Sequence, residues 1–361
     1  MTIGHSYDQL DTPALWTDLN VLDRNIAALA AYFRAAGVQW RPHTKGIKTP
    51  AVAHKLLAAG AHGVTCAKLG EAEVMAAAGV RSILVANQIV TPSKILRLVN
   101  LAAQCEVIAA VDDATNVDAI AAAARAKGVV VGLLIEVDCG MQRAGVAPGA
   151  ATLALAQHIA RTDGVALRGL MSWEGHNLGI VDPEEKRRGI TASVKLLTDS
   201  ADACRAAGLP IEIVSCGGSG TYVVTAHLPG VTEIQAGGGI FCDVTYQSWG
   251  VPLEPALFVR ASVTSRPAPN RVILDAGFKT LPRGYASARP LGVENVESVV
   301  HSAEHCILTL TQPNAQLKIG DGVDFVVGYG DATVFLHEVL HGVRDGVVET
   351  AWPVLGRGKL Q

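Results

Sequence analysis

The chain has 361 residues and a nearly balanced charge, with 30 Lys and Arg against 33 Asp and Glu, and 49% of its residues are hydrophobic. This composition excludes a largely disordered chain. Without a basic excess to neutralise phosphodiester groups, it also argues against binding to nucleic acid.

The N-terminal residues, MTIGHSYDQLDTPALW, lack the basic start and apolar run of a signal peptide. The longest apolar run, residues 129–137, contains Glu136 and is too short to span a bilayer. Seven cysteines are scattered without a CxxC pair, which indicates buried thiols rather than disulfides or a zinc site. We therefore expect a cytoplasmic protein with no membrane contact.

After a helical pattern over residues 22–36, short β-rich runs alternate with stretches of helical periodicity. Strands are predicted at residues 38–40, 63–66, 82–86, 105–111, 129–137, 165–173, 211–215 and 231–235. Helical stretches between them include residues 49–59, 70–78, 92–103 and 183–207, while residues 217–230 give the weakest helical pattern.

Long connections between strands favour parallel pairing, and continuous apolar runs indicate strands that are covered on both faces. Eight such units predict an α/β fold, a (β/α)8 TIM-type barrel. An open, doubly wound sheet is the alternative, but it rarely needs eight regularly spaced units.

The alternation ends near Gly239. Alternating runs at residues 271–275, 307–311, 323–327 and 347–352 then follow, separated by Gly-Asp and Asp-Gly turns. The clearest of these turns are Gly320-Asp321-Gly322 and Asp345-Gly346. We expect a C-terminal antiparallel β domain. The predicted division is a barrel over residues 17–250 and a β domain over residues 251–361 that includes residues 1–16.

In such barrels the chemistry lies at the C-terminal ends of the strands. The first strand is followed by RPHTKGIK, residues 41–48. A lysine here can form a Schiff base if its surroundings lower its pKa, or it can belong to a solvated basic loop. Arg41, like His176 further along the chain, is a candidate for binding a carboxylate or for a structural role.

Two glycine clusters follow the seventh and eighth predicted strands. They are Gly217-Gly218-Ser219-Gly220-Thr221 and, later in the chain, Gly237-Gly238-Gly239. Glycine allows backbone N–H groups to converge on an anion, and loops after strands 7 and 8 are the usual phosphate site of this fold. We therefore favour a phosphate cradle over simple turns.

Two further strand ends carry notable side chains. Arg143 follows the fifth strand, where it can contact a cofactor or form a salt bridge with Glu136 or Asp138. Trp173 ends the sixth strand, where it can stack on a planar cofactor or cap the barrel. A strand-end lysine, a phosphate cradle and an aromatic face together describe a site for pyridoxal phosphate.

Over nearly its whole length, the chain resembles the D-threonine aldolase and D-serine dehydratase-like family of alanine-racemase-type pyridoxal phosphate enzymes, and within it the 3-hydroxy-D-aspartate and D-threonine aldolases. The matching motifs are DTP (11–13), RPHTK (41–45), EVDCG (136–140) with Arg143 and Gly145, GGSGT (217–221), DAG (275–277) with Lys279, EH (304–305), Thr333, GVRDG (342–346) and VETAWPV (348–354).

The resemblance implies that Lys45 forms the Schiff base with pyridoxal 5'-phosphate and that His43 lies beside it. Arg143 would contact the cofactor ring and Trp173 would replace a ring-stacking Tyr. The phosphate would be bound by Gly217, Gly218, Ser219, Gly220, Thr221, Gly237 and Gly238. The family also implies a homodimer.

The segment GYGDAT, residues 328–333, departs from the family pattern. The family's metal site has a His and, two residues later, a Cys or Asp. Asp331 matches the second ligand, but Tyr329 stands at the His position, and a phenol with a pKa of about 10 is a poor ligand for Mg or Mn. A divalent metal (Mg, Mn or Zn) is therefore doubtful. His305 is a possible substitute ligand, and Tyr329 is a candidate catalytic base.

The resemblance implies a lyase that cleaves a β-hydroxy-D-amino acid to glycine and an aldehyde. The cofactor serves as electron sink, and the protein selects which bond breaks. A D-serine or 3-hydroxyaspartate dehydratase and an amino-acid racemase on the same scaffold are the alternatives. A third possibility, from another class, is a non-catalytic cofactor carrier.

Overall fold

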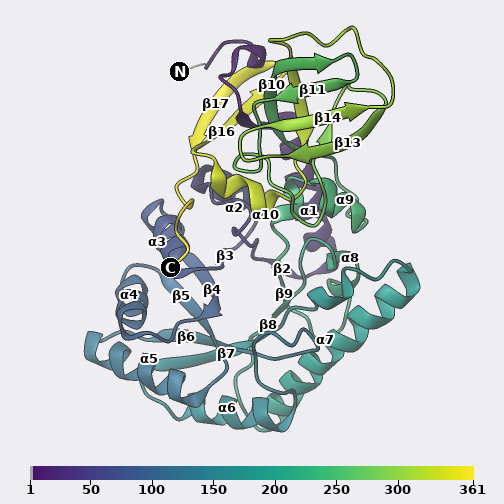
Figure 1. Ribbon diagram of the computed structural model, residues 1–361. Coiled ribbons are helices and arrows are strands. Elements are labelled where there is room, and N and C mark those ends of the chain that lie inside the picture. Colours follow the sequence, from purple (N-terminus) through teal and green to yellow (C-terminus); the bar gives the residue numbers. More distant parts are fainter. Residues whose placement is uncertain (1–2) are drawn as a thin grey trace. The chain divides into compact units, whose positions relative to one another are not determined.

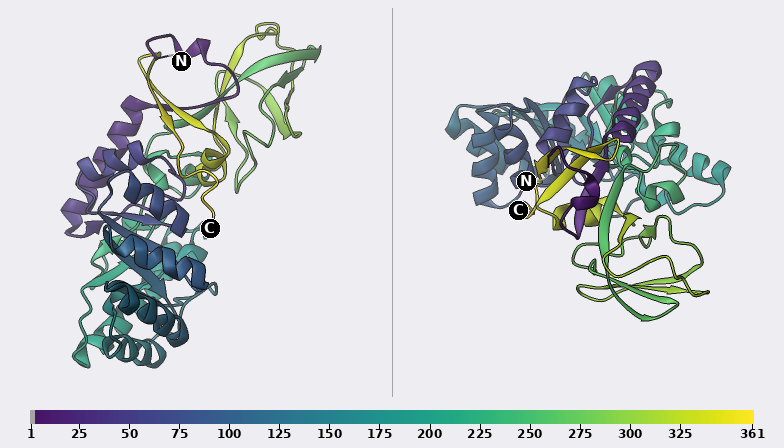
Figure 2. Two further views of the ribbon diagram at one scale, coloured as in Figure 1. Left: turned by 90° about the vertical axis from the view of Figure 1, so that its left-hand side faces the viewer. Right: turned by 90° about the horizontal axis from the view of Figure 1, so that it is seen from above.

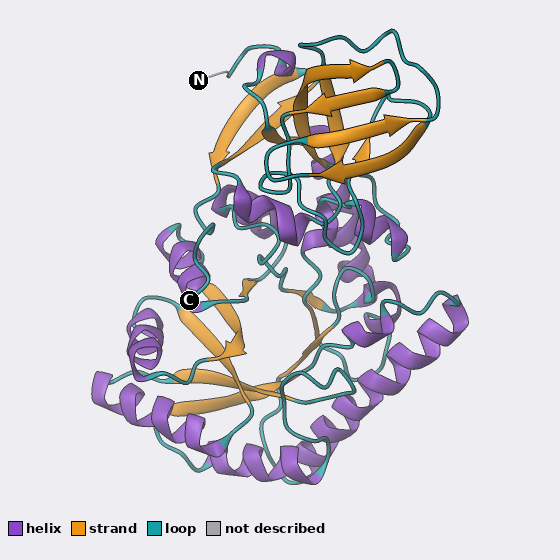
Figure 3. Ribbon diagram, viewed as in Figure 1, coloured by secondary structure: helices purple, strands orange, loops and turns teal. Residues whose placement is uncertain are grey.

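Eight parallel strands and the helices between them form most of the first of two units in the computed structural model, which describes residues 3–361 (Figures 1 and 3). This barrel unit comprises Leu29–Lys45, Val52–Gly237 and Lys359–Gln361. The second unit, here called the β unit, comprises the residues up to Ala28, Gly46–Ala51 and Gly238–Gly358.

The eight strands lie in the order β2-β9-β8-β7-β6-β5-β4-β3, and each neighbouring pair is parallel. A parallel bridge between His43 and Thr65 links the segment after β2 to β3. The backbone N–H of Thr44 also donates to the carbonyl oxygen of Thr65 at 2.7 Å. These contacts join the two ends of the strand order, so the predicted (β/α)8 barrel is confirmed and the open sheet is excluded.

The strands are β2 (Gln39–Trp40), β3 (Val64–Cys66), β4 (Ser82–Gln88), β5 (Glu106–Val111), β6 (Val131–Glu136), β7 (Val165–Met171), β8 (Ile213–Cys216) and β9 (Glu233–Ile234). The helices are α1 (Leu19–Ala36), α2 (Pro50–Ala58), α3 (Leu69–Ala77), α4 (Pro92–Ala102), α5 (Ala114–Lys127), α6 (Ala150–Ala160), η2 (Gly175–Asn177), α7 (Pro183–Ala206) and α8 (Tyr222–Thr225). Each predicted strand run overlaps one observed strand. The connection predicted as the weakest helix holds only the single turn of α8.

Burial on both faces explains the apolar strands. All residues of β6 are buried, and its Leu134 packs with Leu84, Ile108 and Met171 from the neighbouring strands. Local signals set the helix ends. Asp113 caps α5 by accepting from the N–H groups of Thr115 and Asn116, and Gly128 ends that helix in the left-handed conformation at φ 71°.

The β unit is built on a nine-stranded sheet that β1 shares with the C-terminal strands. Its elements are η1 (Tyr7–Gln9), β1 (Ala14–Asp18), η3 (Gly238–Ile240), α9 (Val244–Ser248), β10 (Leu257–Ala268), β11 (Arg271–Leu274), β12 (Arg289–Pro290), β13 (Val296–His301), β14 (Cys306–Leu310), β15 (Gly322–Val326), α10 (Gly330–Thr333), η4 (Val334–Leu336), β16 (Val339–Arg344) and β17 (Val347–Pro353).

The strand pairs of this sheet are antiparallel with one exception, the parallel pair of β1 and β16. The expected antiparallel domain is therefore a mixed sheet. The parallel pair arises because β1 comes from the far end of the chain and needs no hairpin to reach β16. Figure 2 shows the green and yellow strands of this unit from two further sides.

The predicted Asp-Gly turn joins β16 to β17. Asp345 and Gly346 both have positive φ, 50° and 78°, as a two-residue hairpin turn of the favoured twist requires. The core below the sheet includes Trp16 stacked on Phe258, with ring centroids 4.5 Å apart.

The seven cysteines are free thiols, and all except Cys105 are buried. Burial raises the pKa of the Cys139 and Cys306 thiols to about 12. Over residues 3–361, no helix combines the length and apolar character that crossing a membrane requires.

Candidate active site

The residues predicted to hold the cofactor follow the C-terminal ends of different barrel strands. Lys45 follows β2, Arg143 follows β6, Trp173 follows β7, Gly217 follows β8 and Gly237 follows β9. Because these strands are parallel in a closed barrel, their C-terminal ends open on one face. The fold therefore brings the predicted barrel residues to the same face.

The segment that carries Lys45 is held firmly at its base. His43 donates its backbone N–H to the carbonyl oxygen of Gln235 at 3.0 Å, and the buried Thr44 hydroxyl donates to Glu71 Oε1 at 2.7 Å. The Lys45 backbone N–H lies 3.3 Å from His43 Nδ1. The Lys45 side chain itself is exposed. It is thus an accessible amine on a fixed backbone.

Gly237 allows the loop after β9 to approach this segment. A Cβ at Gly237 would overlap the backbone of His43, so no larger residue fits without a shift of the chain. Glycine at position 237 is therefore required by a close backbone approach.

A buried carboxylate organises the loop Gly217–Thr221. Glu174 accepts hydrogen bonds at Oε1 from the hydroxyls of Thr221 and Thr225, both at 2.7 Å, and at Oε2 from the Gly217 N–H at 3.3 Å. Gly218 N–H in turn donates to Thr221 Oγ1 at 3.0 Å. Sequence reasoning missed this role, although Glu174 directly follows Trp173 at a strand end.

Trp173 and Arg143 contact other parts of this face. The ring of Trp173 lies against Gly218, where an added Cβ would come within 2.5 Å of Cη2 and Cζ3. The Trp173 ring therefore borders the glycine loop. Arg143 is half-exposed and lies 3.4 Å from Glu136 Oε1, so the strand-end salt bridge considered above is present.

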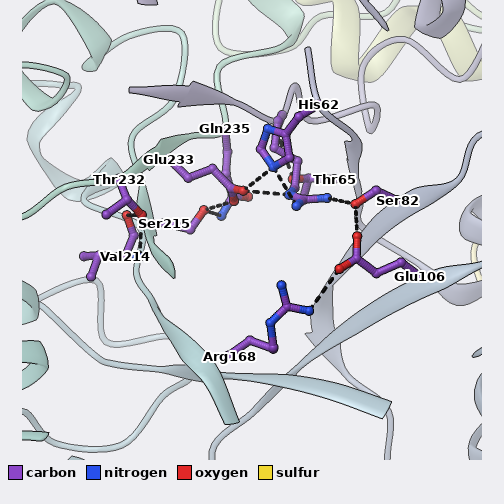
Figure 4. A network of polar contacts seen from close by, with 11 residues as sticks. His62, Thr65, Ser82, Glu106, Arg168, Val214, Ser215, Thr232, Glu233 and Gln235 are labelled. Atoms are coloured by element: carbon purple, nitrogen blue, oxygen red, sulfur yellow. Dashed lines mark hydrogen bonds and ion pairs between the residues drawn. The ribbon is translucent and has the colours of Figure 1, made fainter. Parts of the chain in front are cut away.

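Arg41 belongs to a buried polar network instead of a substrate site. Its side chain is 3% exposed and donates Nε–H to Glu233 Oε2 at 2.8 Å. The network continues from Ser82 through Glu106 to Arg168, with bonds of 2.6 and 2.9 Å (Figure 4). Its members belong to several barrel strands, so the network ties those strands together.

In the β unit, Tyr329 and Asp331 form a hydrogen-bonded pair. Tyr329 Oη donates to Asp331 Oδ2 at 3.1 Å. Burial and the charge of Asp331 raise the pKa of Tyr329 well above its usual value. The buried Asp243 accepts from the N–H groups of Gly330 at 2.6 Å and Tyr246 at 2.9 Å, and burial raises its pKa to about 7.

Three more aromatic rings surround Tyr329, and sequence reasoning missed all of them. The ring centroid of Tyr329 lies 5.1 Å from that of Tyr285, 6.1 Å from that of Tyr246 and 6.2 Å from that of Trp249. Gly284 permits the approach of the Tyr285 segment, since a Cβ there would come within 2.5 Å of Tyr329 Cβ. We call these four residues the aromatic cluster.

Several motifs of the family resemblance have structural roles in the β unit. Thr12 of the DTP motif donates to Asp275 Oδ2 of the DAG motif at 2.6 Å. Gly277 packs so closely on the Ala303 backbone that a Cβ would overlap it. His305 is exposed in the turn between β13 and β14.

The metal implied by the resemblance does not fit these residues. Tyr329 is a protonated donor that already binds Asp331, and both oxygens of Asp243 accept backbone N–H groups. Within the part of the chain that the structure describes, no three His, Cys, Asp or Glu side chains are grouped to hold a metal ion.

Comparison with known families gives two matches that divide the chain in sequence. Residues 17–244 match the alanine racemase N-terminal domain, and residues 256–343 match a putative serine dehydratase domain.

The whole chain is similar to a D-threonine aldolase from Arthrobacter sp., with 34% identity over 98% of this chain and 95% of the relative. The crystal structure of D-threonine aldolase from Filomicrobium marinum covers 100% of both chains with a TM-score of 0.97 and 32% identity. A cysteine-to-alanine variant of D-threo-3-hydroxyaspartate dehydratase, in the metal-free form, has a TM-score of 0.88 and 30% identity over 97% of this chain and 99% of its own.

Proposed function

This chain belongs to the alanine racemase N-terminal domain family, with a putative serine dehydratase domain following, and we propose that it is a pyridoxal-phosphate-dependent aldolase. It would cleave a β-hydroxy-D-amino acid, such as D-threonine, to glycine and an aldehyde. The observation that carries the proposal is the end-to-end match to D-threonine aldolases in sequence and in fold.

The barrel face fits the cofactor by the chemistry of its groups. Lys45 supplies an exposed amine, and the glycine loop Gly217–Thr221 follows a strand that ends on the same face, where such loops commonly bind a phosphate. Gly237 and Gly238 would add backbone groups for the phosphate. Trp173 would border the ring of the cofactor, and Arg143 would lie at its edge. When bound, pyridoxal phosphate accepts the electron pair from the bond that breaks at the substrate Cα.

The remaining roles concern the substrate β-hydroxyl. Retro-aldol cleavage requires a group that accepts the proton of this hydroxyl. Our candidate for that base is His43. It is adjacent in the chain to the fixed Thr44, and its imidazole lies beside the Lys45 backbone. Tyr329 keeps its own proton at Oη and directs it to Asp331.

Purified holoenzyme should release glycine from at least one of D-threonine, D-phenylserine and 3-hydroxy-D-aspartate, with the aldehyde formed in equal amount. Chiral analysis of the remaining substrate would detect racemisation. If no glycine forms from any of the three while the cofactor is bound, the aldolase proposal is rejected.

The dehydratase alternative is favoured by the likeness to D-threo-3-hydroxyaspartate dehydratase in sequence and in fold. Ammonia and a keto acid formed from D-serine or 3-hydroxyaspartate would identify that reaction. The homodimer and the cytoplasmic location stay predictions. A molar mass measured in solution tests the first, and fractionation of the source cells tests the second.

A further inference from the structure

We propose that the Tyr329–Asp331 pair replaces the metal-binding pair that the family resemblance implies, so that this enzyme holds a phenolic proton at the place of the implied divalent cation and works without one. The inference rests on the proposed function only for its activity readout. Its metal-binding readout is independent of any reaction.

The donor chemistry of Tyr329 disfavours a bound cation. A divalent cation such as Mg²⁺ or Mn²⁺ prefers ligands that are deprotonated or carry free oxygen lone pairs. Tyr329 presents a protonated Oη that donates to Asp331 Oδ2 at 3.1 Å. A cation at this position would have to displace the phenolic proton and break this hydrogen bond.

Close neighbours pack against both side chains of the Tyr329–Asp331 pair. The ring of Tyr329 lies against those of Tyr246, Trp249 and Tyr285 in the aromatic cluster. Asp331 is confined as well, because a Cβ at Gly46 would overlap its carboxylate and one at Gly238 would lie 3.2 Å from Oδ1. The positions of both side chains are therefore set by close neighbours.

Hydrogen bonds also hold the backbone around the Tyr329–Asp331 pair. Gly330 N–H donates to Asp243 at 2.6 Å, and the Thr333 hydroxyl donates to the Tyr329 carbonyl oxygen at 2.9 Å. Thr245 Oγ1 donates to the Gly328 carbonyl oxygen at 2.6 Å. Hydrogen bonds within the β unit therefore fix the backbone on both sides of the pair.

The test is a gain of metal binding. Holoenzyme of the wild type, Tyr329→His, Tyr329→Phe and the double variant Tyr329→His with Asp331→Asn is dialysed against Mn²⁺ and then against metal-free buffer. Bound metal is measured by atomic emission, and free Mn²⁺ by electron paramagnetic resonance. Circular dichroism and cofactor absorbance establish that each variant is folded.

We expect the wild type and Tyr329→Phe to retain no stoichiometric metal, and Tyr329→His to retain one Mn²⁺ per chain, which the added Asp331→Asn change removes. A wild-type protein that retains one cation per chain overturns the proposal. So does a folded Tyr329→His protein that stays metal-free, because residue 329 would then not decide metal binding.

Activity provides the second readout. Wild-type turnover should be unchanged by a chelator, and Tyr329→Phe should lower kcat because it removes the phenolic proton while keeping the ring. A chelator-sensitive wild type, or a Tyr329→Phe variant with unchanged kcat, contradicts the proposal. If none of the amino acids is cleaved, the aldolase proposal fails, while the metal measurements still decide this one.

Discussion

The carboxylate of Glu174 and the hydroxyl of Thr221, joined by a 2.7 Å hydrogen bond, connect the end of β7 to the glycine loop after β8. Glu174 is fully buried and also accepts from Thr225 Oγ1 and the Gly217 N–H. Burial of a carboxylate costs free energy unless hydrogen bonds within the protein replace those it made with water. Here that compensation fixes the conformation of the loop expected to bind phosphate.

Replacing Glu174 by Ala leaves two hydroxyls and one N–H without their acceptor in a buried place. We expect a loss of about 3 kcal/mol in the free energy of unfolding and weaker binding of pyridoxal phosphate. Thr225→Val, which removes a single hydroxyl, should cost only about 1 kcal/mol. Denaturant unfolding and cofactor titration measure both effects. Unchanged cofactor affinity in a folded Glu174→Ala protein contradicts the organising role.

Gly237→Ala should move the segment that carries Lys45, because the added Cβ overlaps the His43 backbone. We expect a destabilisation of roughly 1–3 kcal/mol, typical of overpacking, together with lower cofactor affinity. Gly179→Ala is the matched control, since nothing lies within 4 Å of its added Cβ. Equal melting temperatures for the two variants would show that the close approach is not needed.

The barrel could be predicted from sequence because its strands are covered on both faces, so that each reads as a continuous apolar run. The buried β6 is the clearest case. The β unit was harder to predict from the sequence. The edge strand β13, for example, alternates only between partly buried and exposed residues, which leaves a weak signal. The parallel pairing of β1 with β16 has no local signal, because it joins opposite ends of the chain.

In the candidate site, too, some residues could be predicted from the sequence and others could not. Lys45 and the glycine loops could be located by a simple rule, since they follow predicted strands of a barrel. Glu174 could not, because the hydroxyls it accepts from are 47 and 51 residues away in the chain. The aromatic cluster combines three separate segments, and no spacing predicts that their rings meet around Tyr329.

Lys45→Ala should abolish the visible absorbance of covalently bound cofactor, because no amine remains at that position. Lys48→Ala should retain it, since Lys48 is buried, with its backbone against Gly356. Absorbance spectra of the two purified variants, each reconstituted with pyridoxal phosphate, decide between the lysines. The reverse pattern would assign the bond to Lys48.

Asp243 should make stability depend on pH. Burial raises its pKa in the folded protein to about 7, against an ordinary value of 3.8. Between these values the folded protein binds more protons than the unfolded chain, so the free energy of unfolding should fall as the pH rises from about 4 to about 7 and then level off.

Asp243→Asn should remove this part of the pH dependence, because the amide resembles the protonated acid and does not titrate. Urea unfolding of both proteins at several pH values measures the difference in slope. Identical slopes for wild type and Asp243→Asn would show that Asp243 has no raised pKa.

Arg41 was a candidate for a second substrate carboxylate, but its buried ion pair with Glu233 predicts a structural role. Arg41→Ala leaves the Glu233 carboxylate buried without its guanidinium partner, which should cost roughly 3–5 kcal/mol. The double variant Arg41→Met with Glu233→Met should recover much of that loss, because two apolar side chains need no charge compensation.

In the milder Arg41→Lys variant, KM for 3-hydroxy-D-aspartate and for D-threonine should change by the same factor. A rise in KM confined to 3-hydroxy-D-aspartate would instead assign Arg41 to the substrate.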